Sequence, residues 1–487
     1  MLTVHLRIND AATGKPTPVR LRIAGPDGTT YPPLGRFAEF PTGRNEDVGV
    51  HLKLGRESWC YIDGSCEVKL PAGVPLRVRA TKGPEYTPLD QTITLGPGQI
   101  ALRFTLERWT YFAADGWVSG DTRCHFIPPH AALLEAAAED LAVVNLLACS
   151  QPVPSLDGTA YPGVPHLIAF SGQGAALGAD SCLVVVNTLN THPALGKVGL
   201  LHSHRVIFPL AFGEPDDTDD WSVCDWCDQC HRKGGLAVWV DAFRPAAGLL
   251  GGESLVAAIL GKIDAVEIDD LPRSQPLLPW IYRLWNAGLP VPLVGGSGKD
   301  SNKIPLGGMR TYAKLPASPG REREGIYRDW IEAIRAGRTF ATNGPLLKFA
   351  VADRGADGVV RVEASVESLG SFEKLQVVMN ADVVAEAPPD ATEPRRGSVT
   401  LSQPVDRPSW LALRCTGADG LFAHTSPVVV RVNGEAPRER GAALGLARLV
   451  EQTREWVADH GRFTNPKARP HLLELCGAAL GRLGGAP

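Results

Sequence analysis

The fold is decided by LAVWVD at 236–241 and by the segments that follow it: ESLVAAILGK (253–262), DAVEID (264–269), QPLLPWIYRLWNAG (275–288) and PVPLVGG (290–296). Short, wholly apolar strands alternate here with segments of helical periodicity, which is typical of a parallel sheet covered on both faces. The same rhythm starts earlier, with PHAALLEAAAED (129–140), LAVVNLLA (141–148), LIAFSG (167–172), CLVVVN (182–187) and VGLLHSH (198–204). The whole stretch, roughly 235 residues, has the size of a (β/α) barrel.

The flanks of this stretch are β-rich. Segments such as VRLRIAG (19–25) and LRVRAT (76–81) alternate in polarity between Gly/Pro turns, and VVRVEASVE (359–367) repeats the pattern after the barrel. Two amphipathic helical stretches close the chain. We therefore predict an α/β protein of 487 residues with four parts: an N-terminal β-sandwich (1–108), the barrel (109–345), a second β-sandwich (346–436) and a helical tail (437–487).

The composition is that of a soluble globular protein. Apolar residues make up 44% and charged residues 21%, and the net charge of −4 provides no basic field to attract nucleic acid. No stretch approaches the ~20 apolar residues of a membrane span. The start, MLTVHLRIND, alternates like a strand and lacks the features of a signal peptide. We expect a cytoplasmic protein, or a secreted one if a leader was removed, with neither nucleic-acid nor membrane partners.

Polar side chains follow several of the predicted barrel strands. In a (β/α) barrel the reactive groups lie at the carboxyl ends of the strands. A single Asp at such a place is often only a helix N-cap, but His and Asp together are the ligands that divalent metals prefer. The sequence therefore predicts a site at this end of the barrel, formed from Asp121, His125, His202, His204, Asp241, Asp269, Asp270 and Asp300.

Four segments resemble, in this order, the carbaryl-hydrolase (CehA/McbA) branch of the PHP-type metallohydrolases. They are SGDTRCHF (119–126), GGLAVWVDAF (234–243), GGSGKDSNKIPLGGMRTYAKL (295–315) and WIEAIRAGRTFATNGPLL (330–347). The resemblance covers roughly 109–350 and extends weakly to LFAHTSPVVV at 421–430. It implies a distorted (β/α) barrel, often with flanking β-domains, that binds two or three metal ions at the strand ends.

The sequence departs from the family pattern at the metal motifs. The family's first His-x-His is represented by Arg123 and His125, and LLACSQ (146–151) stands where an Asp-His pair is usual. Asp241 stands where the family has a histidine. Of the family's late Asp-x-His motif, the aspartate has the clear counterpart Asp300, which is the remaining candidate ligand there. The resemblance therefore implies the fold more strongly than the usual multi-metal centre.

The HSH sequence at 202–204 is a candidate replacement for the missing ligands. Histidines at i and i+2 on a strand point the same way, so His202 and His204 are expected to reach one ion. In the competing interpretation, one histidine packs in the barrel core and the other bonds to a loop. Arg123 and Arg205 would bring two guanidinium groups to the mouth, which favours an anionic substrate.

A single remaining ion predicts a hydrolytic mechanism. His125 and His204, with Asp241 or Asp300, would hold Zn²⁺, Mn²⁺ or Fe²⁺ with one open position. The metal-bound hydroxide would attack an ester, amide, carbamate or phosphoester, a neighbouring Asp would take the proton, and one of the two arginines would stabilise the oxyanion. The leading expectation is thus a metal-dependent hydrolase with an altered metal centre, acting on a small-molecule or glycan-like substrate.

The alternative is a catalytically silent barrel that binds a carbohydrate or an anionic ligand. The two sandwiches would then be recognition modules, and the 11 tryptophans are compatible with glycan stacking. Metal content and the geometry of the barrel mouth separate the two functions. If His125, His204, Asp241 and Asp300 lie too far apart to share an ion, the binding function is favoured.

A cysteine cluster, Cys224, Cys227 and Cys230 followed by His231, stands out in the composition. The CDQCH sequence matches a haem-attachment motif, and four such residues in a loop could bind zinc. The segment reads as a helix, however, with Trp221, Cys224 and His231 on a stripe that faces the sheet. Because free cysteine behaves as a small apolar residue, we predict core packing.

The acidic run EPDDTDD (214–220) precedes this helix. It lacks the spacing of an EF-hand loop, so a Ca²⁺ site is not expected. We predict a solvated loop in which Thr218 or Asp219 caps the helix.

Overall fold

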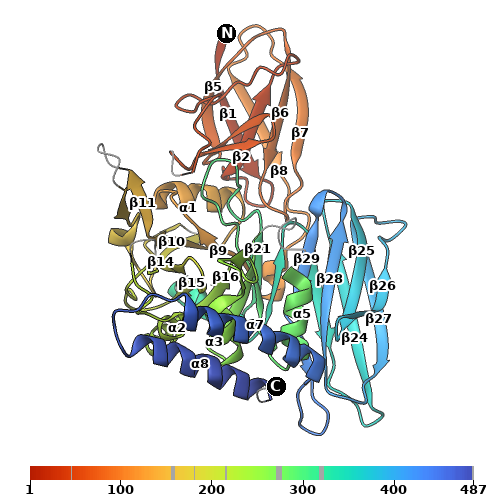
Figure 1. Cartoon of the computed structure of the whole chain (residues 1–487). Coiled ribbons are helices and arrows are strands. Elements are labelled where there is room, and N and C mark those ends of the chain that lie inside the picture. Colours follow the sequence, from red (N-terminus) through yellow and green to blue (C-terminus); the bar gives the residue numbers. More distant parts are fainter. Residues whose placement is uncertain are drawn as a thin grey trace. The chain divides into compact units, whose positions relative to one another are not determined.

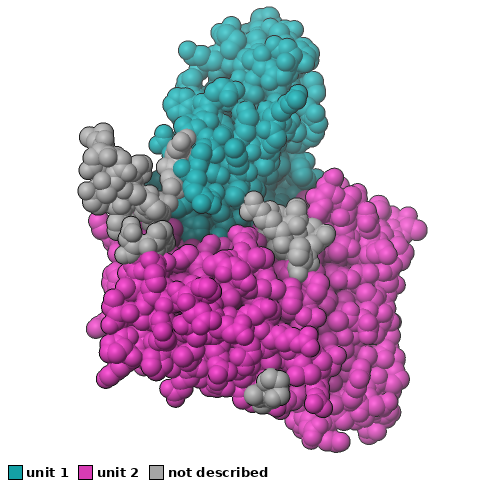
Figure 2. Space-filling view, in the orientation of Figure 1, with its two compact units in different colours: residues 1–146, 175–185, 296–310 teal, residues 147–174, 186–295, 311–487 magenta. Residues whose placement is uncertain are grey.

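The computed structural model describes residues 1–44, 47–154, 160–179, 181–213, 217–269, 277–316 and 323–484. The chain divides into two compact units, coloured separately in Figure 2. Unit 1 comprises residues 1–146, 175–185 and 296–310, and unit 2 comprises residues 147–174, 186–295 and 311–487. Both units draw on distant parts of the sequence, and they cut across the four predicted ranges.

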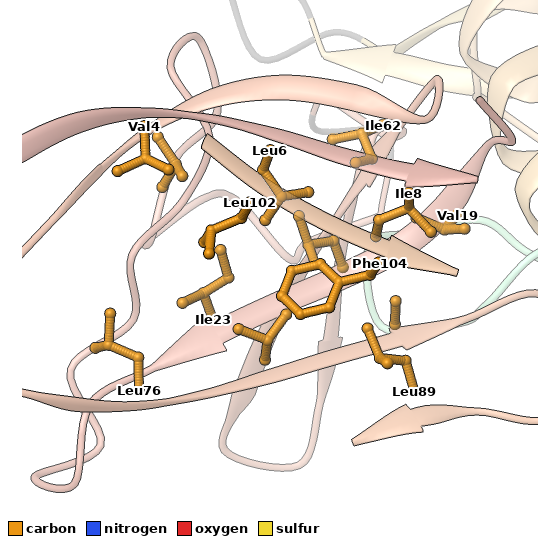
Figure 3. Packing of buried hydrophobic residues seen from close by; sticks show 14 of the residues in the cluster. Val4, Leu6, Ile8, Val19, Ile23, Ile62, Leu76, Leu89, Leu102 and Phe104 are labelled. Carbon is orange, nitrogen blue, oxygen red and sulfur yellow. The ribbon is translucent and has the colours of Figure 1, made fainter. Parts of the chain in front are cut away.

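Unit 1 begins with a β-sandwich. One sheet has the order β5-β1-β8 and the other the order β3-β4-β2-β6-β7. The alternating polarity of β1 turns Val4, Leu6 and Ile8 inward, where they pack with residues such as Ile23 and Phe104 (Figure 3). The eight strands are β1 (Leu2–Asp10), β2 (Val19–Ala24), β3 (His51–Leu54), β4 (Glu57–Ile62), β5 (Ser65–Leu70), β6 (Pro75–Thr81), β7 (Leu89–Thr94) and β8 (Ala101–Leu106). The strands predicted at the start of the chain, at 19–25 and at 76–81 are confirmed as β1, β2 and β6.

Unit 1 also contains a strand, a helix, a long loop and residues 175–185. Strand β9 (Trp117–Cys124) runs parallel to the start of β10 (Val143–Cys149). Between them, α1 (Pro129–Ala138) packs on the outer face of β2 and β4, where Ala138 joins Trp59 and Tyr61 in a buried cluster. The loop 296–310 lies against the end of β9.

The sheet of unit 2 is mixed rather than parallel. Strands β16 (Leu236–Val240), β19 (Ala265–Ile268) and β20 (Leu293–Gly295) are parallel neighbours, as predicted. Strand β15 (Gly196–Leu201), however, runs antiparallel both to β16 and to β14 (Cys182–His192). The prediction of a uniformly parallel sheet is therefore wrong at β15.

Three helices alternate with these strands as the sequence predicts: α2 (Val223–Arg232), α3 (Gly252–Ile259) and α5 (Leu278–Asn286). One expected strand is absent, because the LIAFSG segment instead contains a 3₁₀ turn, η2 (Leu167–Ala169). The shorter strands of unit 2 are β11 (Gln151–Pro154), β12 (Ala160–Gly163), β17 (Pro245–Ala246) and β18 (Leu249–Leu250). Strand β13 (Leu177–Ala179) belongs to unit 1 and pairs with the start of β14.

The C-terminal part of unit 2 contains two sets of antiparallel strands. One is a separate sheet with the order β23-β24-β27. The other set, β22-β29-β28-β25-β26 with β30 paired to β28, is the antiparallel end of the same long sheet that contains β16 and β15. The elements are β21 (Arg310–Lys314), α6 (Arg323–Arg335), β22 (Thr339–Thr342), β23 (Leu346–Val351), β24 (Val359–Glu367), β25 (Phe372–Met379), β26 (Asp382–Ala387), β27 (Arg396–Pro404), β28 (Ser409–Gly417), β29 (Phe422–Thr425) and β30 (Val428–Val430).

The tail forms the two predicted helices, α7 (Arg440–Asp459) and α8 (Ala468–Leu483). They lie against each other and against α3, as the dark blue ribbons of Figure 1 show. Among the described residues, no helix is both long and apolar enough to cross a membrane.

Candidate functional site

The end of β9 in unit 1 is organised by Asp121. Its side chain is completely buried and accepts hydrogen bonds from the backbone N–H groups of Arg123 (3.0 Å), Ser297 (2.9 Å) and Gly307 (2.9 Å). Burial raises the pKa of this carboxyl group above its usual value. Both oxygens are thus engaged by backbone donors, and Asp121 holds the loop 296–310 against the strand.

Three of the predicted site residues, Arg123, His125 and Asp300, lie beside or in this loop. A Cβ atom at Gly298 would lie 3.0 Å from Arg123 Nη2, so the arginine occupies the space beside the glycine. The backbone N–H of His125 donates to Lys299 O at 2.6 Å. Asp300 Oδ2 accepts from Nε and Nη2 of Arg44 at 2.7 and 2.6 Å. Asp300, expected as a metal ligand, is part of an ion pair.

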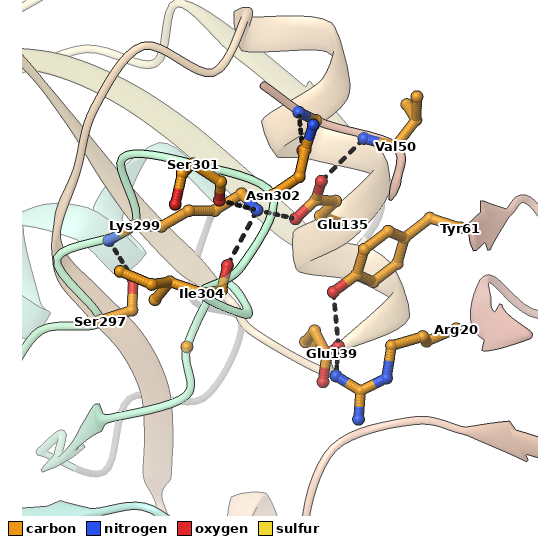
Figure 4. A network of polar contacts seen from close by, with 12 residues as sticks. Arg20, Val50, Tyr61, Glu135, Glu139, Ser297, Lys299, Ser301, Asn302 and Ile304 are labelled. Atoms are coloured by element: carbon orange, nitrogen blue, oxygen red, sulfur yellow. Dashed lines mark hydrogen bonds and ion pairs between the residues drawn. The ribbon is translucent and has the colours of Figure 1, made fainter. Parts of the chain in front are cut away.

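The sequence reasoning missed a buried ion pair beside these residues. Lys299 Nζ lies 3.4 Å from Glu135 Oε2, and neither side chain is exposed to solvent (Figure 4). Lys299 Nζ also donates to Ile304 O at 2.9 Å, and Glu135 Oε1 accepts from Val50 N at 2.8 Å. The sequence feature that could have indicated this ion pair is the glutamate within the alanine-rich stretch of α1. A carboxylate on an inward-facing helix surface is rarely buried without a partner.

In unit 2, His202 and His204 follow β15 and face backbone carbonyl groups. His202 Nδ1 lies 3.0 Å from Gly234 O, and His204 Nδ1 lies 2.8 Å from Lys233 O. His202 is half-buried against the Tyr327 ring, with ring centroids 5.2 Å apart, and burial lowers its pKa. His204 and the adjacent Arg205 are exposed.

Asp241 lies at the other end of the neighbouring strand. In the antiparallel pairing of β15 with β16, Leu201 lies opposite Leu236 and Lys197 lies opposite Val240. The five residues of β16 span about 16 Å at ~3.3 Å per residue. His204 follows Leu201 and Asp241 follows Val240, so they lie at opposite ends of these strands. The prediction that they share one ion is wrong, because the sequence pattern does not encode strand direction.

Asp241 is instead neutralised by two cations. Its Oδ2 lies 2.7 Å from Lys197 Nζ and its Oδ1 lies 2.9 Å from Arg244 Nη1. Asp269, at the end of β19, lies 3.5 Å from Arg244 Nη2. Asp270 lies outside the described residues.

The positions of the His, Cys, Asp and Glu side chains decide whether they can bind a divalent metal ion together. Within the described ranges, no three side chains of His, Cys, Asp or Glu form a group that could hold an ion. A catalytic zinc site needs three protein ligands besides its open position. The described residues therefore do not fit the expected catalytic metal centre.

The cysteine cluster is core, as predicted. Cys224, Cys227 and Cys230 are completely buried in α2, and burial raises the pKa of each thiol. The predicted stripe is wrong at one end, because Trp221 precedes the helix and is 48% exposed. His231 lies 2.8 Å from Asp264 instead of packing in the core.

The predicted cap of α2 is also wrong. Neither Thr218 nor Asp219 caps the helix: the N-cap is Ser222, whose Oγ accepts from Asp225 N at 3.2 Å. Glu253 extends the cap from α3 by accepting from Val223 N at 2.9 Å. This buried carboxylate lies at the positive end of the helix dipole.

A cleft of about 610 Å³ lies between α7 and the hairpin of β17 and β18. Its lining includes the indole of Trp456, the amide of Gln452 and the carboxylates of Glu455 and Asp459. Neither carboxylate joins an ion pair with any described residue, and both are exposed. Ligand sites commonly have this volume, and they combine an aromatic surface with a few hydrogen-bonding groups.

A scan of protein-family models and a search of curated proteins find no match to this chain.

Proposed function

We propose that this chain is a PHP-like barrel protein of the carbaryl-hydrolase type that binds a carbohydrate and does not hydrolyse it. The four family-like segments support the fold assignment. The cleft beside α7 carries the functional part of the proposal. It offers an indole surface, on which a sugar ring can stack, beside amide and carboxylate groups that bond to hydroxyls.

The arrangement of the expected metal ligands supports binding over hydrolysis. Asp300 and Asp241 are paired with arginine or lysine, and His204 and Asp241 lie at opposite ends of adjacent strands. Metal binding by Asp300 or Asp241 would break these ion pairs and leave the arginine and lysine side chains without partners.

The test is binding of an oligosaccharide panel to the full chain, measured by calorimetry. We expect saturable binding that weakens at least tenfold in Trp456→Ala. Trp221→Ala is the matched control, because Trp221 is exposed but does not line the cleft. Glu455→Gln, at an exposed position, tests the cleft without disturbing packing. Absence of saturable binding, or equal weakening in Trp221→Ala, would overturn the proposal.

The second candidate is the metal-dependent hydrolase, favoured by the orientation of His202 and His204. With each Nδ1–H donated to a backbone carbonyl, each Nε2 carries the lone pair that a metal ligand needs. The measurement is metal content of the purified and Zn²⁺-, Mn²⁺- or Fe²⁺-reconstituted protein, followed by an ester and phosphoester panel. Stoichiometric metal lost in His202→Ala, together with turnover, would support hydrolysis. No bound metal would reject it.

A further inference from the structure

One face of α7 brings negative charge to the cleft beside the hairpin of β17 and β18. Four of its residues stand at positions i, i+3, i+4 and i+7, so they share one side of the helix, and all of them line the cleft: Gln452, Glu455, Trp456 and Asp459. Two like charges four residues apart repel each other, as Glu455 and Asp459 do here. Both carboxylates are exposed to the same space as the indole.

The place of these carboxylates on α7 leaves their charge without compensation. Asp459 is the last residue of the helix and Glu455 lies one turn earlier, near the negative end of the helix dipole. The last turn contains no basic residue, and the neighbouring Arg454 lies 3.2 Å from Glu451 instead. The described residues that line the cleft include no lysine or arginine, and of them only the exposed His460 can carry a positive charge. The cleft therefore favours a cation over a neutral or anionic group.

The indole of Trp456 offers a cation a second favourable contact. The ring is half-buried and makes a T-shaped contact with the buried imidazole of His192, with the ring centroids 6.0 Å apart. The imidazole is itself held by Asp219, whose Oδ1 lies 2.8 Å from Nε2 of His192. Trp456 is thus kept in place by a packed neighbour and still lines the cleft. Among aromatic side chains, tryptophan attracts a cation most strongly.

The size and the lining of the cleft suit an organic cation. The hairpin contributes Ala247, Gly248 and Leu249, whose side chains are short or apolar, and the volume is about 610 Å³. Such a volume holds an organic ligand of several rings. A divalent metal ion needs several ligands converging on one point, and the described residues contain no group of three His, Cys, Asp or Glu side chains that could hold one.

We propose that this cleft binds an amino sugar, with the protonated amino group between Glu455 and Asp459 and the sugar ring stacked on Trp456. This inference rests on the proposed carbohydrate function and names its ligand class. The ammonium group donates charge-assisted hydrogen bonds to the two carboxylates, and the indole contributes a stacking surface. The amide of Gln452 remains for the sugar hydroxyls, to which it can both donate and accept.

The test compares two oligosaccharides that differ in charge: a tetramer of β-1,4-linked glucosamine and the same tetramer with every amine acetylated. Each is titrated into the full chain by calorimetry at about pH 6, where the free amines are protonated. We expect the glucosamine tetramer to bind at least tenfold more tightly. Added NaCl should weaken the binding of this tetramer alone, because salt screens interactions between exposed charges.

The double variant Glu455→Gln/Asp459→Asn removes both charges at exposed positions with little change in shape. It should weaken the binding of the glucosamine tetramer at least tenfold and change the Kd of the acetylated tetramer less than threefold. Glu451→Gln is the matched control, because Glu451 lies on the same helix, pairs with Arg454 and does not line the cleft. It should change either Kd less than twofold.

The measurements separate failure of this inference from failure of the proposed function. If the acetylated tetramer binds as tightly as the glucosamine tetramer, or if the double variant binds both as Glu451→Gln does, the amino-sugar inference is wrong and the carbohydrate function stands. If neither tetramer nor any member of the oligosaccharide panel binds saturably, the carbohydrate function is wrong and this inference fails with it.

Discussion

Lowering the pH from 7 to 5 should destabilise unit 2 through His424 of β29. The imidazole is completely buried, its Nε2 accepts from the Tyr282 hydroxyl at 2.7 Å, and its Nδ1 faces Thr425 O at 2.8 Å. Burial lowers its pKa to about 4, and the nearby Arg414 acts in the same direction. Burial also raises the pKa of Tyr282 to about 12, so the hydroxyl keeps its proton and is the donor.

The sign and size of the effect follow from linkage. The folded state favours neutral His424, so its contribution is fully present above the unfolded pKa of ~6.5 and is lost as the pH falls towards about 4. A difference of roughly 2.5 pKa units corresponds to about 3 kcal/mol, of which about 2 kcal/mol is lost between pH 7 and pH 5. This is a large share of the stability of a typical domain.

The assay is denaturant unfolding at pH 7, 6 and 5, followed by tryptophan emission. Trp285 and Trp410 pack near this network and report on it, with the Trp285 ring 5.8 Å from His424. His424→Gln should remove about 2 kcal/mol of the pH dependence. His471→Gln is the control, because His471 is 43% exposed. Equal pH dependence in wild type and His424→Gln would refute the reasoning.

Three further predictions concern an ion pair, a glycine and the α2 thiols. Lys299→Ala should cost about 3–5 kcal/mol of unfolding free energy, because it leaves Glu135 buried and unpaired. The double variant Lys299→Met/Glu135→Leu should recover much of this loss. Equal losses of unfolding free energy in the single and the double variant would contradict an ion pair. Gly298→Ala should lower the melting temperature more than Gly434→Ala, because both have positive φ but only the first meets a side chain; the reverse order would disprove the close approach. Iodoacetamide at pH 8 should leave the α2 thiols unmodified until denaturant is added, which peptide mass spectrometry can check.

Local patterns predicted most of the secondary structure. The alternation in β1 and the apolar runs of β16 and β19 are short-range signals, and each segment folds as its periodicity indicates. The burial of the α2 cysteines followed from the same kind of reasoning. The LIAFSG segment shows the limit, because a short apolar run fits several backbone conformations.

The sequence did not predict which side chains lie together, because this depends on how the strands pair. His204 and Asp241 each follow a strand in the sequence, but only the pairing of β15 with β16 decides that these ends lie apart. The sequence pattern of an aspartate after a strand is also the same whether the side chain caps a helix, binds a metal or pairs with a distant cation. Asp300 takes its partner, Arg44, from a segment 256 residues away.

The sequence by itself determined the elements, because hydrogen bonding and side-chain periodicity act over a few residues. It also showed that Arg123 stands where the resembled family has the first histidine of its His-x-His motif. Only the tertiary structure decided strand direction, the burial of Lys299 with Glu135, and the cleft between α7 and the hairpin of β17 and β18. These depend on contacts between distant segments, where desolvation and charge pairing set the energy.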